Sequence, residues 1–234
     1  MKTLIIHPKD PSTAFVKEMY KDFDWTVIDD PRVSKKKLKK EIQAHDRIFM
    51  IGHGTPHGLL TSERTIIDSN MVYLLREKEC IFFWCDADKF VEKYDLKGFY
   101  TGMIISEQVE ADFYQVWANQ EEINESNDLM MRAVKESVDS GDMLKNLKEI
   151  YNSEVNPKND VIGFNEVRFY HSDSKPDNKP ENYSVGAMGA FLLERVNEDP
   201  KMITAILKEI GLPFSLMSYD RYFKIKPQKE KQLV

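Results

Sequence analysis

The sequence predicts an α/β fold built as a three-layer sandwich, with a mostly parallel central sheet, helices on both faces and a small helical C-terminal extension. Short blocks that are apolar at every position alternate with longer amphipathic segments over residues 1–170. Such blocks are typical of strands buried on both faces, as in parallel sheets covered by helices. The alternation of the two kinds of segment favours an open α/β sheet.

The elements follow one another at short intervals, and most have a local reason for their type. Ser34 precedes a very basic helical segment and is expected to cap it. Met103–Ile105 is the shortest of the apolar blocks assigned as strands. The predicted elements are a strand over Thr3–His7, a helix over Thr13–Asp22, a strand over Trp25–Ile28, a helix over Ser34–Ala44, and strands over Arg47–Ile51, Ile81–Trp84 and Met103–Ile105.

A polar segment divides the chain into unequal parts. Residues 172–182 hold two prolines and no apolar side chain, which is typical of a linker or an exposed loop. We therefore expect an α/β domain over residues 1–171 and a helical extension over 183–234. Within that extension, Ala187–Val196 and Pro200–Ile210 are predicted helices, and the basic tail after Ile225 is expected to fray.

The composition excludes several classes of protein. A net charge of −6 argues against a general nucleic-acid binder. No apolar run approaches the roughly 18 residues of a membrane span, and the N-terminus has the pattern of a strand rather than a signal peptide. Two cysteines give neither a disulfide framework nor a Cys₄ zinc site. The expectation is a cytoplasmic chain with reduced thiols, no membrane or nucleic-acid partner, and no indication of oligomeric state.

Two predicted strands end in residues that can carry chemistry. The strand Arg47–Ile51 leads to Gly52-His53-Gly54, and the strand Ile81–Trp84 leads to Cys85. Functional groups of open α/β sheets gather at the carboxyl edge, so the imidazole and the thiol would lie together if these strands are parallel neighbours. A cysteine peptidase needs this pair, because the imidazole takes the proton of the thiol and later protonates the leaving amine.

Each signal also has a purely structural interpretation. A cysteine at a buried strand end is more often a small core residue than a nucleophile. A single histidine is more often a hydrogen-bonded loop residue than a base, and Gly-His-Gly is compatible with a simple turn. The joint placement of His53 and Cys85 is what favours the functional interpretation.

The motifs RIFMIGHG (47–54) and CIFFWC (80–85) resemble those of the caspase-like cysteine peptidases, which include caspases, legumain, gingipains, clostripain, separase and CHAT-type proteases. That family has an apolar strand ending in His-Gly and then an apolar strand ending in Cys. The resemblance covers roughly residues 1–171. It further implies that residues 96–116 hold the next strand and a substrate-binding loop, and that residues 159–171 hold the last strand of the domain.

The resemblance implies that Cys85 is the nucleophile, that His53 is the general base and acid, and that the N–H groups of Gly54 and Cys85 bind the oxyanion. His57 is the alternative base, farther from the strand end. The same resemblance implies a peptide or protein substrate, no cofactor, no metal, and a bacterial or phage-borne chain. From their own positions, Glu107, Asp86 and Ser106 are the candidate substrate-binding residues. The two acids would attract a Lys or Arg side chain, or they are solvated loop acids, which is the favoured interpretation for Asp86.

Several residues depart from the family pattern or allow other chemistry. Phe83 stands where basic-specific members carry an acid, so substrate preference does not transfer. Asp86 and Asp88 disfavour a thiolate at Cys85, which is compatible with a catalytically silent caspase-like or flavodoxin-like module that binds a protein or small ligand. The histidines, Cys85 and the two aspartates match no tight zinc-ligand spacing. The lysine-rich run over residues 34–40 is more simply an exposed helix face than a phosphate site.

Overall fold

A six-stranded sheet forms the centre of the computed structural model, which describes residues 1–61, 63–154 and 159–173. The strand order is β2-β1-β3-β7-β8-β9, and every neighbouring pair is parallel except β8 with β9. Three-residue strands, β2 and β9, form the two edges. The strands of this sheet are β1 (Thr3–Ile6), β2 (Thr26–Ile28), β3 (Arg47–Ile51), β7 (Glu79–Phe83), β8 (Phe99–Thr101) and β9 (Phe169–His171).

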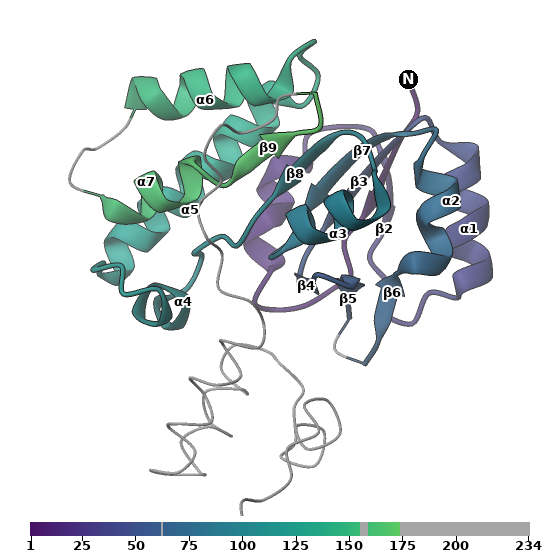
Figure 1. The fold of residues 1–234 in the computed structure, drawn as a ribbon, viewed down its shortest axis with the longest axis horizontal. Coiled ribbons are helices and arrows are strands. Elements are labelled where there is room, and N and C mark those ends of the chain that lie inside the picture. The colour runs from purple at the N-terminus through teal and green to yellow at the C-terminus, as the bar shows by residue number, and fades with distance from the viewer. Residues whose placement is uncertain (62, 155–158, 174–234) are drawn as a thin grey trace, which may run out of the picture. The chain divides into compact units, whose positions relative to one another are not determined.

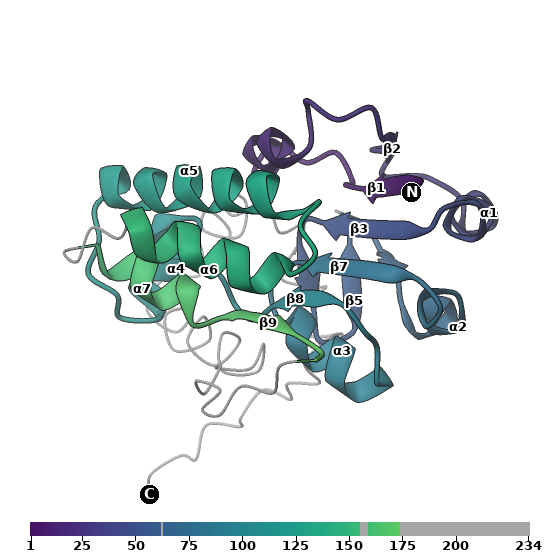
Figure 2. The same ribbon diagram turned by 90° about the horizontal axis from the view of Figure 1, so that it is seen from above.

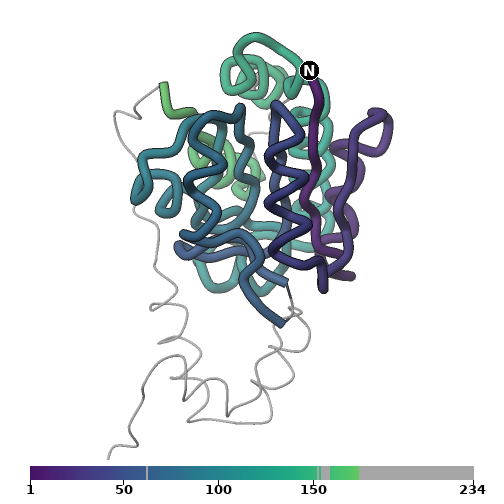
Figure 3. The backbone as a smooth tube through the Cα atoms, turned by 90° about the vertical axis from the view of Figure 1, so that its right-hand side faces the viewer, coloured from purple at the N-terminus to yellow at the C-terminus, as the bar shows by residue number. Residues whose placement is uncertain are grey.

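Helices cover both faces of the sheet, as Figures 1 and 2 show. Helices α1, α2 and α3 pack on one face, and η1, α5, α6 and α7 pack on the other. Figure 3 looks onto the side where α1 and α2 lie. The helices are η1 (Ala14–Met19), α1 (Lys35–Ala44), η2 (Ser69–Met71), α2 (Val72–Leu75), α3 (Ala87–Tyr94), α4 (Gln108–Phe113), α5 (Gln120–Ser137), α6 (Met143–Glu154) and α7 (Asp160–Glu166).

The alternation of side chains along the inner strands builds two apolar cores. In β3, Ile48 and Met50 face the core under α1, whereas Phe49 and Ile51 face the core under α5 and α6. Every residue of β3 is buried, which explains why the strand is apolar at both faces. The α/β fold with a mostly parallel sheet and helices on both faces is therefore confirmed.

A small antiparallel sheet follows β3 at the lower edge of the central sheet in Figure 1. It comprises β4 (Gly54–Thr55), β5 (Gly58–Leu60) and β6 (Thr65–Ile67). The backbone N–H of Leu60 donates to the His53 carbonyl oxygen at 2.8 Å. This hydrogen bond attaches His53, the second residue after β3, to the small sheet.

Most of the predicted elements are confirmed, and one strand is misplaced. The strand Arg47–Ile51 has the predicted bounds, and the Ser34 side chain accepts the Lys37 N–H as the expected cap of α1. The fifth strand of the sheet is Phe99–Thr101 rather than Met103–Ile105. Gly98 precedes it with φ of +126°, and a Cβ there would lie 1.9 Å from the Cys80 carbonyl oxygen. The close pairing of β8 with β7 thus starts at a glycine, and the more apolar block follows as a buried loop.

The predictions for the C-terminal third of the chain fall only partly on residues that the structure describes. Residues 159–171 contain the last strand, but only its final three residues are strand, after helix α7. Apart from Ser172 and Asp173, the predicted linker lies outside the described residues, as do the two C-terminal helices and the basic tail. Within the described ranges, no helix is both long and apolar enough to cross a membrane.

Candidate active site at the carboxyl edge of the sheet

The two predicted catalytic residues follow the carboxyl ends of adjacent parallel strands. Strands β3 and β7 pair in register up to Ile51 opposite Phe83. The Gly52 N–H extends the pairing by donating to the Phe83 carbonyl oxygen at 3.2 Å. His53 and Cys85 are each the second residue beyond the paired ends, and neighbouring strands lie ~4.8 Å apart. The shared edge predicted from the sequence is therefore present.

His53 is bonded on the side of the neighbouring strand β1. Its Nε2 lies 2.6 Å from the Ser12 Oγ and 3.8 Å from the Asp10 Oδ1, both in the loop after β1. Burial lowers the pKa of the His53 imidazole, and the nearby Asp10 carboxylate opposes that shift. The imidazole is held in a defined position and is neutral at neutral pH.

Cys85 lies on the opposite side, against the loop between β8 and α4. Burial raises the pKa of the thiol well above its usual range, and the carboxylates of Glu110, Asp86 and Glu107 raise it further. A hydrogen bond from the Ile104 backbone N–H acts in the other direction. Among the described residues, no hydrogen bond joins the Cys85 sulfur to the His53 imidazole. Catalytic hydrogen bonds are often long in unliganded enzymes and shorten when substrate binds.

Gly54 and Trp84, the residues beside the candidate dyad, pack directly against each other. A Cβ on Gly54 would lie 1.9 Å from the Trp84 Cδ1, so this position requires glycine for close approach. The indole Nε1 of Trp84 donates to the Thr55 carbonyl oxygen at 3.3 Å. The loop that carries His53 and the strand end that carries Cys85 are therefore in direct contact.

The two predicted substrate-binding residues Ser106 and Glu107 have structural partners at the start of α4. The backbone N–H groups of both donate to the Glu110 Oε2, at 2.6 and 3.1 Å, and the Ser106 hydroxyl donates to it at 3.0 Å. Glu107 and Glu110 form a capping box. Burial raises the pKa of the Glu110 carboxyl to about 7 despite these donors.

Asp86, the third predicted substrate-binding residue, also has a partner. Its Oδ1 accepts a hydrogen bond from the Lys89 Nζ at 2.7 Å, and it is only 4% exposed. Its backbone has φ of 64°, in the left-handed region, and it precedes α3. The turn that presents Cys85 thus continues directly into a helix, and the Asp86 carboxylate is bonded to Lys89 of that helix.

Two asparagines fix the loop beside Cys85. Asn165, which is fully buried, accepts the Ile105 N–H at 2.8 Å through its Oδ1 and donates to the Ile105 carbonyl oxygen at 2.9 Å through its Nδ2. Asn127 donates to the Ser106 carbonyl oxygen at 2.9 Å. Side chains of α7 and α5 therefore take the place of a neighbouring strand for this loop, next to the Ile104 N–H that contacts the thiol.

The alternative base and the second cysteine lie in different surroundings. His57 is exposed in the turn between β4 and β5, where its backbone N–H donates to the Thr55 Oγ1 at 3.1 Å. Cys80 is buried within β7, and its Sγ contacts the Leu75 carbonyl oxygen at 3.5 Å. Of the two histidines, His53 is the one attached to the sheet edge.

The sequence interpretation did not identify Asp10, Ser12 or Glu110 as site residues. The pattern Asp10-Pro11-Ser12 follows the first strand, and Asp and Ser are typical of turns that bond their own backbone. Glu110 stands three residues after Glu107, which is the spacing of a capping box. Both signals are local, whereas the contacts with His53 and Cys85 depend on the tertiary fold.

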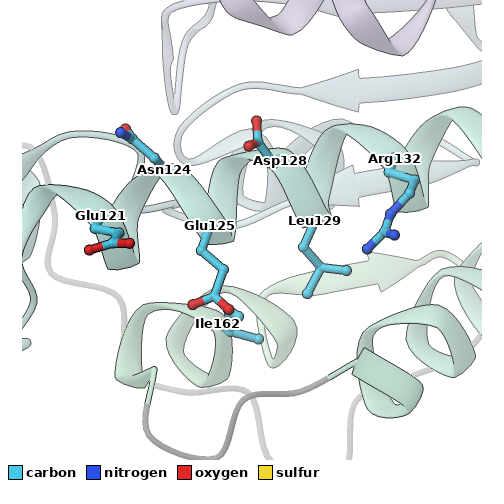
Figure 4. Close-up of a pocket in the computed structure, with 7 residues that line it drawn as sticks. All are labelled: Glu121, Asn124, Glu125, Asp128, Leu129, Arg132 and Ile162. Atoms are coloured by element: carbon cyan, nitrogen blue, oxygen red, sulfur yellow. The ribbon is translucent and has the colours of Figure 1, made fainter.

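A separate pocket of about 590 Å³ lies between α5 and α7 (Figure 4). None of its lining residues is among the predicted site residues. They are Glu121, Asn124, Glu125, Asp128, Leu129, Arg132 and Ile162. In the part of the chain that the structure describes, no group of three His, Cys, Asp or Glu side chains is arranged to hold a metal ion.

The candidate site is thus built from three neighbouring strand ends. The loop after β1 supplies Asp10 and Ser12, β3 leads to His53, and β7 leads to Cys85. In comparisons with known proteins, no family model, no curated protein and no solved structure matches this chain.

Proposed function

We propose that the chain is a cysteine endopeptidase of caspase-like type, with Cys85 as nucleophile and His53 as general base and acid. The observation that carries the proposal is the register of β3 and β7, which brings both residues to equivalent positions beyond adjacent parallel strands. The motifs RIFMIGHG and CIFFWC occupy these strands and the turns after them. The backbone N–H groups of Gly54 and Cys85 are the proposed oxyanion donors.

The charges around the thiol favour a mechanism that starts from neutral groups. Because the Cys85 pKa is raised and the His53 pKa is lowered, the resting pair is a thiol and a neutral imidazole. The imidazole then removes the thiol proton as the sulfur attacks the carbonyl carbon, instead of stabilising a preformed thiolate.

The acidic surroundings of the thiol also bear on the substrate. Glu107, Glu110 and Asp86 all act on Cys85, so a cationic side chain bound beside the thiol would lower its pKa and favour reaction. We therefore propose a peptide or protein substrate with Lys or Arg near the cleaved bond. The free thiols of Cys80 and Cys85 support a reducing, cytoplasmic setting, and we propose a bacterial or phage-borne source.

The test combines peptide cleavage with covalent labelling. Fluorogenic peptide libraries are incubated with the full chain and with Cys85→Ala, and an acyloxymethyl ketone peptide ending in Lys is used as the label. We expect cleavage by the wild-type chain only, and a mass increase on the peptide that contains Cys85. Cys80, which lies within β7 against the Leu75 carbonyl oxygen and not at the strand end beside His53, is the internal control. Equal labelling of both cysteines would contradict an activated Cys85.

The second candidate function is a catalytically silent module that binds a protein or a small ligand. The raised pKa of Cys85 and the missing hydrogen bond to His53 favour it. In that case Cys85→Ala keeps partner binding, and no peptide in the library is cleaved by either chain.

A further inference from the structure

The loop after β1 holds a chain of hydrogen bonds that ends on the candidate base. Asp10 Oδ1 accepts both the Ser12 N–H at 3.0 Å and the Ser12 hydroxyl at 2.7 Å. The same hydroxyl oxygen lies 2.6 Å from the His53 Nε2. The hydroxyl thus stands between a carboxylate and an imidazole.

The donors and acceptors of this chain can be assigned by counting protons. A serine hydroxyl has one proton, and here it points to Asp10. The Ser12 oxygen can therefore only accept from His53, so the proton of the neutral imidazole is on Nε2. The free electron pair is then on Nδ1. This assignment of donors and acceptors also excludes Ser12 as a nucleophile activated by His53, because the Ser12 proton is donated to Asp10 and not to the imidazole.

The loop is fixed independently of His53. His7, at the end of β1, is 1% exposed, with its Nδ1 2.8 Å from the Tyr20 hydroxyl and its Nε2 3.1 Å from the Thr13 Oγ1. The Lys9 N–H donates to the Asp29 carbonyl oxygen at 2.8 Å. Contacts on both sides of Asp10 and Ser12 therefore hold the hydrogen-bond chain in place before substrate arrives.

We propose that Ser12, oriented by Asp10, is a positioning residue that fixes His53 as the Nε2–H tautomer and makes Nδ1 the nitrogen that exchanges protons with Cys85. This inference rests on the proposed peptidase function. The thiol proton moves to Nδ1 as the sulfur bonds to the carbonyl carbon, and the Nδ1 proton leaves with the amine when the C–N bond breaks. Water then gives a proton to Nδ1 and a hydroxide to the carbonyl carbon. The C–S bond breaks, and the sulfur regains the proton.

Asp10 has a second role, which is to stabilise the positive charge of the imidazolium formed in the first step. Its carboxylate lies 3.8 Å from Nε2 and raises the pKa of His53 against the effect of burial. The other titratable group that acts on His53 is His7, which is neutral because burial lowers its pKa to about 4. The Nε2 proton stays bonded to Ser12 throughout, so the positive charge is stabilised without transfer of that proton.

The test uses the full chain labelled with ¹⁵N, and long-range ¹H–¹⁵N spectra of its five histidines. His53 is assigned with His53→Gln. We expect the Nε2–H tautomer in the wild type, a mixture of tautomers and a lower His53 pKa in Ser12→Ala, and wild-type spectra in Ser12→Thr. Asp10→Asn, which keeps an acceptor but removes the charge, is expected to keep the tautomer and lower the pKa. Ser140→Ala, which removes a serine hydroxyl bonded to the Ser137 carbonyl oxygen and not to His53, is the matched control.

Kinetics on the cleaved peptide give the second measurement. We expect Ser12→Ala to lower kcat by on the order of 10-fold or more with KM unchanged, and Ser12→Thr to restore it. If the chain cleaves peptides but its His53 is the Nδ1–H tautomer, the proposed role of Ser12 is wrong and the peptidase function stands. The Nε2–H tautomer in a chain that cleaves no peptide would instead refute the peptidase function, and with it any catalytic role of this tautomer.

Discussion

The contact between Gly54 and Trp84 makes a quantitative prediction. In Gly54→Ala, the new methyl group would start 1.9 Å from the Trp84 Cδ1 and 2.3 Å from the Cγ. Carbon atoms normally approach to about 3.5 Å, so one of the two groups must move by about 1.6 Å. Trp84 is 2% exposed and packs edge-on against Phe82 and Phe90, which leaves the indole little freedom. We expect a loss of ~1–3 kcal/mol in the free energy of unfolding, the range for overpacked cores.

Urea unfolding measures this loss. With a slope of ~2 kcal/mol per molar urea, the midpoint of Gly54→Ala should fall by about 1 M. Gly163→Ala is the matched control, because its added Cβ meets nothing within 4 Å and lies within helix α7. It should raise stability by ~0.4–1 kcal/mol. Combining Gly54→Ala with Trp84→Leu should give less than the sum of the two losses. An unchanged midpoint in Gly54→Ala, or additive losses, would refute the argument from close packing.

The remaining predictions concern buried polar groups. Because the folded-state pKa of His7 is about 4 instead of 6.5, stability is lost as the pH falls through this window, by up to ~3 kcal/mol. Glu110 acts in the opposite direction, since a carboxyl with its pKa raised to about 7 stabilises the fold as the pH falls from 7 towards 4.5. Urea midpoints are therefore compared at pH 8 and pH 5 for two variants. In His7→Gln, where only Glu110 titrates, the midpoint should rise between pH 8 and pH 5. In Glu110→Gln, where only His7 titrates, it should fall. Parallel profiles for the two variants would show that these groups do not titrate as described. Asn165→Leu removes both partners of the buried Ile105 backbone and should cost ~2 kcal/mol or more, seen as a lower unfolding midpoint; a wild-type midpoint would mean that these bonds are replaced.

The fold was predictable where burial and local signals agree. The strand Arg47–Ile51 is buried at every position, and the four residues after Arg47 form a continuous apolar run up to the end of the strand. The prediction failed at Met103–Ile105, which is as buried as a strand, but the Ile105 backbone is bonded by the Asn165 side chain and not by a neighbouring strand. An apolar run reports burial, and it does not reveal whether a strand or a side chain satisfies the backbone. The small sheet β4-β5-β6 was missed because its strands have two or three residues.

The candidate site was predictable only in part, because only some of its contacts follow from the order of the strands. His53 and Cys85 follow strands, so the rule that parallel strands end at one edge was enough to bring them together. Ser12 lies 41 positions from His53, and its contact depends on the pairing of β1 with β3. Glu110 lies in a helix whose sequence indicates a cap, but nothing in that pattern indicates that its carboxyl acts on Cys85.

The antiparallel strand β9 has a consequence for synthesis of the chain. Of the strands in the described part of the chain, β9 comes last, and it covers the edge of β8, whose three residues are all buried. On the ribosome, that edge stays unpaired until about 170 residues have emerged, and an unpaired apolar edge is a site of aggregation. Any shortened version of this protein should therefore extend through His171, because a chain that stops at Arg168 would expose β8 and remove the Tyr170 ring that packs on Tyr100.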